Sequence, residues 1–150
     1  NLGAGKYKRI TQGMRQSFYL CFVAAALAAL ICCCAGPFMV SWFISNPSAE
    51  TMNAAMQYLY TISAFMIPLG WIFIYRNGLQ GLDRGFLPML SGVVELVSRY
   101  VVILIAAKPY GYLGVCFADP AAWLVTGIML LIAYLAWKHQ MSEHIKACEE

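Results

Sequence analysis

The chain has 150 residues, of which 61% are hydrophobic and only 11% are charged, and its formal net charge is +3. Because soluble domains carry roughly 25% charged residues, this composition excludes an ordinary soluble protein and predicts an integral membrane protein. Long runs without charge predict an all-α, polytopic fold with four transmembrane helices. The sequence begins at Asn1 rather than at a methionine, so we expect it to be a piece of a longer protein.

The first part of the chain, residues 1–16, is polar and basic, and we predict a cytoplasmic loop there. Its basic residues are Lys6, Lys8, Arg9 and Arg15. The first span, residues 17–43, follows and contains no charge. Near its end, Gly36-Pro37 predicts a kink or the end of regular helix.

The second span, residues 53–75, has one mildly polar face with helical spacing. That face holds Asn53, Gln57, Thr61, Ala64 and Pro68. Pro68 removes a backbone hydrogen bond deep in the span, as happens where a broken helix lines a transport cavity. A kink made only for packing explains Pro68 equally well, and the sequence leaves both interpretations open.

The third span, residues 85–107, contains the charges Glu95 and Arg99, four residues apart. On a helix they lie on one face, in a stripe that also includes Gly92. A lone charge at the bilayer centre costs at least about 2.5–3.5 kcal/mol, so this stripe should face protein or water. We consider Glu95 and Arg99 candidates for an ion or substrate pathway, with Gln57, Thr61, Pro68 and Gly92 as candidates for cavity lining or kinks.

The fourth span, residues 120–137, is preceded by Asp119-Pro120, a typical helix start. We predict Asp119 as the N-cap and Pro120 as the first helical residue, in preference to an ion ligand at Asp119. Residues 138–150 form a polar, cytoplasmic tail. Its two histidines, His139 and His144, have no third ligand nearby in the sequence, so we predict solvation rather than metal binding.

Basic residues are distributed unequally between the two ends of the predicted spans. The N-terminal arm has four, the loop at residues 76–84 has two and the tail has two, whereas the loops on the other side have one, Lys108. The positive-inside rule therefore predicts that both termini are cytoplasmic.

The sequence contains no Ser/His/Asp set, no paired carboxylates and no Cys-x-x-Cys pair. We therefore predict that the protein is not an enzyme and that it holds no cofactor and no metal. Nucleic-acid binding has no basis, because the basic arm is short and lies beside a membrane span. The expected partner is the lipid bilayer, with anionic head groups near that arm.

Three segments resemble one transporter family, the multidrug and toxic compound extrusion (MATE) family. Residues 1–9, NLGAGKYKR, resemble the loop before the ninth helix. Residues 78–88, GLQGLDRGFLP, are similar to the glycine-rich start of the eleventh helix. Residues 111–123, GYLGVCFADPAAW, resemble the start of the twelfth. The three occur in family order across almost the whole chain.

The resemblance implies that this chain is the back part of the C-terminal lobe in a transporter of about twelve helices. Such proteins export organic cations and drugs in exchange for H⁺ or Na⁺, as two lobes rock around a central cavity. The remaining helices of the transporter would then be partners of this chain. In the sodium-type members an acid lies on the tenth helix, but residues 53–75 contain none, so that site is in doubt here.

Two alternatives to this interpretation remain. The chain could be a complete four-helix exporter that works as an oligomer, or a non-transport structural subunit of a membrane complex. The role of Glu95 also stays open: it could belong to a proton or cation path that Arg99 modifies, or the two residues could form a neutral pair that fixes helix packing.

Overall fold

The computed structural model describes residues 1–147, with side chains described through Ser142. It confirms an all-α chain, and the helices follow one another with short connections. Their bounds are α1 Tyr7–Phe43, α2 Ala49–Ala64, α3 Met66–Gly81, α4 Phe86–Tyr110, α5 Tyr112–Cys116 and α6 Ala118–Ala147. Three of the described helices are long and apolar enough to cross a membrane, and a fourth span results if α2 and α3 are counted as one.

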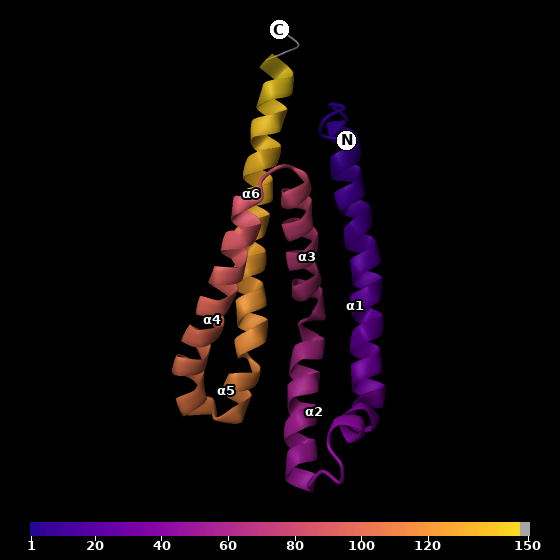
Figure 1. Ribbon diagram of the computed structural model, residues 1–150, viewed down its shortest axis with the longest axis vertical. Helices are drawn as coiled ribbons and strands as arrows, with labels where there is room; N and C mark the ends of the chain where they lie inside the picture. The colour runs from indigo at the N-terminus through magenta and orange to yellow at the C-terminus, as the bar shows by residue number, and fades with distance from the viewer. Residues whose placement is uncertain (148–150) are drawn as a thin grey trace.

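In the view of Figure 1 the long helices extend along the long axis of the molecule. Helices α2 and α3 stack end to end in one column, with α1 on one side and with α4 and α6 on the other. Helix α1 packs against α2 and α3, while α6 packs against both α3 and α4. The N-terminus and the end of α6 lie at the same end of the molecule (Figure 1).

Helix α1 is longer than the sequence suggested, because it begins at Tyr7 within the predicted loop of residues 1–16. The apolar side chains of Ile10 and Met14 pack against the core of the molecule, and burial of such a face favours helix where composition alone favours a loop. Gly36-Pro37 does not end the helix, which continues to Phe43.

The second span is broken into α2 and α3, which meet at an angle of 52°. Ser48 caps α2 by accepting a hydrogen bond from the Thr51 amide at 3.1 Å. The break lies at Phe65, three residues before Pro68. Proline has no amide hydrogen to donate to the carbonyl four residues earlier, which here belongs to Ala64, so a break at this point has a direct cause.

The connection between α4 and α5 is the single residue Gly111. Helix α4 continues through Pro109 to Tyr110, and Gly111 then reverses the chain with φ 56°. This positive φ favours glycine because a Cβ there would be strained. After the short α5, helix α6 begins at Ala118 and continues to Ala147, so that residues 138–147 of the predicted tail prolong the fourth span as helix.

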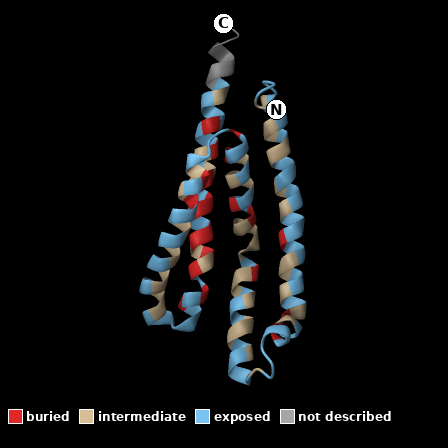
Figure 2. Cartoon of the chain, viewed as in Figure 1, coloured by how far each residue is buried: buried red, intermediate tan, exposed pale blue. Residues whose placement is uncertain are grey.

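Among the described residues, α6 contributes more buried side chains than any other helix (Figure 2). Leu130, Tyr134 and Trp137 of α6 form a cluster with Ile72 and Leu79 of α3. Large apolar side chains on the outer faces of α1 and α4 are exposed instead. In a bilayer these faces meet lipid tails or further helices, so their exposure is expected of a membrane protein.

Candidate functional site

The charged pair of the third span forms as its spacing predicted. Arg99 Nη2 donates to Glu95 Oε1 at 2.9 Å, one turn apart on α4. At a rise of 1.5 Å per residue, Glu95 lies roughly 14 Å from the start of the helix at Phe86. The pair therefore sits well inside the span, where neither charge can reach the bilayer surface easily.

A third charge joins this pair from α3. Arg76 Nη2 donates to Glu95 Oε2 at 3.1 Å, and Arg76 Nε donates to Ser91 Oγ at 3.0 Å. The prediction that Arg76 lies in the loop at residues 76–84 is wrong, because α3 continues to Gly81. Arg76 consequently points from inside one span toward the middle of the next. It does not count as a loop residue when the positive-inside rule is applied.

A fourth charge comes from the start of α6. Asp119 Oδ1 forms an ion pair with Arg99 Nε, although this N–H is not aligned for a hydrogen bond. Asp119 Oδ2 accepts a hydrogen bond from the Tyr58 hydroxyl of α2 at 2.7 Å. The prediction that Asp119 is the N-cap is wrong: α6 begins one residue earlier, and both carboxylate oxygens of Asp119 contact side chains of other helices.

We call these four residues, Arg76, Glu95, Arg99 and Asp119, the charged ladder. Its members come from α3, α4 and α6, and Tyr58 attaches it to α2. Two positive and two negative charges make the formal charge of the ladder zero. The four side chains are 20% to 36% exposed, so one edge of the ladder remains open to whatever covers this surface.

The other candidates lie outside the ladder. Gln57 is exposed, and its backbone carbonyl accepts a hydrogen bond from the Thr61 hydroxyl at 2.8 Å. Gly92 is exposed on α4, and a Cβ there would meet no atom within 4 Å. Pro68 lies beside the helix break. The structure thus brings Glu95 and Arg99 together, and it joins neither to the remaining candidates by a hydrogen bond.

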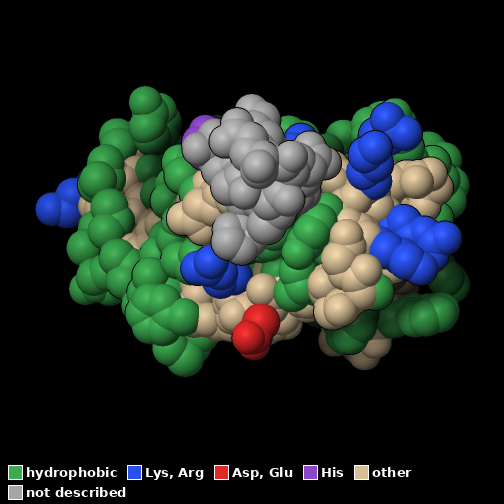
Figure 3. All heavy atoms as spheres, turned by 90° about the horizontal axis from the view of Figure 1, so that it is seen from above, with side chains coloured by type: hydrophobic (Ala, Val, Ile, Leu, Met, Phe, Trp, Pro, Cys, Tyr) green, Lys and Arg blue, Asp and Glu red, His purple; other side chains and the backbone are tan. Residues whose placement is uncertain are grey.

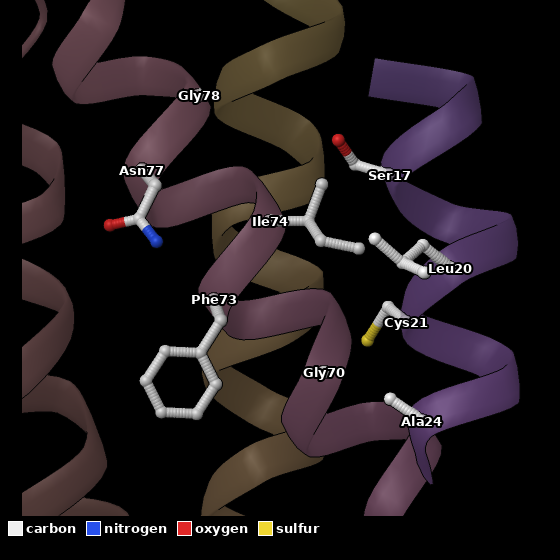
Figure 4. A pocket seen from close by; sticks show the side chains of 9 residues that line it. All are labelled: Ser17, Leu20, Cys21, Ala24, Gly70, Phe73, Ile74, Asn77 and Gly78. Atoms are coloured by element: carbon white, nitrogen blue, oxygen red, sulfur yellow. The ribbon is translucent and has the colours of Figure 1, made fainter. Parts of the chain in front are cut away.

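A separate surface groove of about 590 Å³ lies between α1 and α3 (Figure 4). Cys21 points from α1 toward Gly70 of α3, and Gly78 approaches Met14 of α1. The groove contains none of the candidates identified from the sequence. Its walls are mostly apolar, as expected where two helices pack closely through small residues in lipid.

Within the part of the chain that the structure describes, no group of three His, Cys, Asp or Glu residues is placed to hold a metal ion. His139 is exposed on α6, and the side chain of His144 lies outside the described residues. The chemistry that the described residues offer is therefore ion pairing and hydrogen bonding across helices.

Sequence reasoning missed Arg76, Asp119 and Tyr58 as members of this site. Arg76 could have been found by extending the second span by two turns, which would have placed it inside the helix. Tyr58 and Asp119 are 61 positions apart in the chain, and no local sequence pattern predicts a contact over such a separation. The pairing depends on how α2 and α6 pack.

Comparison with known proteins identifies one family. The model of the MatE family matches residues 1–105, which is more than half of the chain. No curated protein and no solved structure matches the sequence. The matched residues include α1 to α3 and most of α4, with three members of the charged ladder. The chain therefore belongs to the MatE family of membrane transport proteins.

Proposed function

We propose that this chain is part of a secondary active multidrug antiporter that exports organic cations or drugs in exchange for H⁺ or Na⁺ by alternating access. The match to the MatE family over residues 1–105 carries this proposal. The three apolar helices and the bent pair α2–α3 are consistent with it, because a transporter lobe needs several spans around a cavity.

Within such a transporter, we place the chain in the back part of the C-terminal lobe, at helices resembling 9 to 12. The motifs at residues 1–9, 78–88 and 111–123 support this placement. So does the surface of the molecule, because the ladder is partly exposed along one edge and α1 and α4 carry apolar outer faces. Charges inside a span need cover from protein or water, and other helices of the transporter would provide it.

Both termini would face the cytoplasm of the cell. The N-terminus and the end of α6 lie at one end of the molecule (Figure 1), and this end carries Lys and Arg side chains (Figure 3). Arg76 lies inside α3 and Lys108 lies in the last turn of α4, so each end loses one loop charge and the excess of basic residues stays at the end with the N-terminus. The positive-inside rule therefore still favours this orientation.

The proposal is tested with the full-length protein that contains this chain, purified and reconstituted in liposomes. A fluorescent organic cation is loaded, and its efflux is followed after a proton gradient or a sodium gradient is imposed. We expect efflux with one of the gradients and none after an ionophore has collapsed it. Gradient-independent leakage, or no efflux of any cation tested, would overturn the antiporter function and favour a structural subunit.

A further inference from the structure

We propose that the charged ladder is a charge-balanced clamp that fixes α2, α3, α4 and α6 as one rigid body, and that Glu95 is not the coupling-ion site. This inference rests on the proposed transporter function, because it assigns a role within the transport cycle. It goes beyond the pairing of Glu95 with Arg99, since it depends on Arg76, Asp119 and Tyr58.

Each of the four carboxylate oxygens of the ladder already contacts a guanidinium or hydroxyl group. Arg99 and Arg76 donate to the two oxygens of Glu95. Arg99 and Tyr58 contact the two oxygens of Asp119. A coupling ion or a cationic substrate at these oxygens would compete with the bound guanidinium groups, whereas a transport site needs an acid that can release its ligand.

The positive and negative charges of the ladder are equal in number. Replacing one carboxylate of the ladder by a neutral group would leave two guanidinium groups against one carboxylate, and the ladder would gain a net positive charge inside the span. A net charge at this depth is unfavourable, while a paired set of zero net charge is tolerated. The balance of two positive and two negative charges therefore suits a fixed clamp.

The ladder also supports the break between α2 and α3. The bent pair α2–α3 lacks the hydrogen bond that an amide at position 68 would donate to the carbonyl of Ala64, so its angle of 52° needs support from elsewhere. The ladder holds both halves of the pair: Tyr58 of α2 is bound to Asp119, and Arg76 of α3 is bound to Glu95. Tying both halves to α4 and α6 fixes the angle while the lobes rock.

The test compares double variants of the full-length transporter that carry the same number of substitutions. R76Q/E95Q and R99Q/D119N each remove one charge of either sign, so the ladder stays neutral and one intact ion pair remains. E95Q/D119N and R76Q/R99Q remove two charges of one sign and leave a net charge of plus or minus two. The readouts are the amount of protein in the membrane, its melting temperature in detergent and efflux per molecule.

We expect the two neutral variants to retain more folded protein and a higher melting temperature than the two charged variants. We also expect R76Q/E95Q to retain ion-coupled efflux per molecule, although it lacks Glu95. The clamp is overturned if all four variants are equally stable. It is also overturned if R76Q/E95Q is well folded but has lost coupled efflux, because Glu95 would then carry the ion.

A second measurement tests rigidity without touching the ladder. The rings of Phe65 and Phe117, from the α2–α3 break and the α5–α6 connection, have centroids 6.1 Å apart. Cysteines at these two positions, in a background without the native cysteines, can be joined by a short thiol cross-linker. Efflux should survive cross-linking if these elements move together, and its loss would contradict a rigid body.

The stability ranking of the four double variants stays informative even if the wild-type protein shows no efflux. Failure of the clamp and failure of the proposed function are therefore distinguishable.

Discussion

Helix α5 lies very close to the backbone of α4 at Gly114, and replacing Gly114 by alanine should destabilise the protein. Gly114 is buried in α5, directly against the backbone of Ala106 in α4. A Cβ at position 114 would lie 2.6 Å from the carbonyl carbon of Ala106, about 0.8 Å inside the 3.4 Å at which ordinary contact begins, and closer still to its oxygen. Backbone atoms cannot rotate away, so α5 would have to move as a unit.

Overpacking of this kind typically costs about 1–3 kcal/mol. Alanine recovers roughly 0.5–1 kcal/mol in a helix, because glycine loses more conformational freedom on folding. We therefore expect Gly114→Ala to lower the free energy of unfolding by about 1–2 kcal/mol, which is roughly a tenfold change in the folded-to-unfolded ratio. The assay is thermal unfolding of the full-length protein in detergent, read as the fraction that still elutes as a single peak after heating.

The matched control is Gly13→Ala in α1, where a Cβ would meet no atom within 4 Å. This variant should be as stable as the wild type or slightly more stable, since alanine favours helix. If Gly114→Ala melts at or above the temperature of the Gly13→Ala variant, the close approach of α5 to α4 is not a feature of the folded protein.

Two further predictions concern the packing of α6 and α1. Leu130→Ala should destabilise the protein by about 2–5 kcal/mol because Leu130 is fully buried, whereas Leu135→Ala on the exposed face of α6 should be nearly neutral in the same thermal assay. Gly70→Ala should also lower the melting temperature, because its Cβ would overlap Cys21 Sγ. Adding Cys21→Ala should then restore much of the loss, since the next atom of residue 21, its Cβ, is 3.9 Å away. Equal melting temperatures for the Leu130 and Leu135 variants, or no recovery in the double variant, would refute the respective contact.

The sequence by itself determined the class of the fold. A chain with 61% hydrophobic residues in long uncharged runs must satisfy its backbone inside the lipid, and helices do so locally. The contact of Glu95 with Arg99 was predictable for the same reason: residues four apart on a helix are neighbours whatever surrounds them. Pro68 likewise signalled a disturbed helix, since the missing donor is a property of the residue.

Tertiary packing decided the rest. Helix α1 extends back to Tyr7 because Ile10 and Met14 find a core to pack against, which the polar composition of residues 1–16 conceals. Arg76 and Asp119 were assigned to a loop and to a helix cap, yet each contacts a charge on α4. These contacts join residues 19 to 61 positions apart when Tyr58 is included. Contacts over such separations produce no periodic pattern in a sequence, because they depend on how whole helices are placed beside one another.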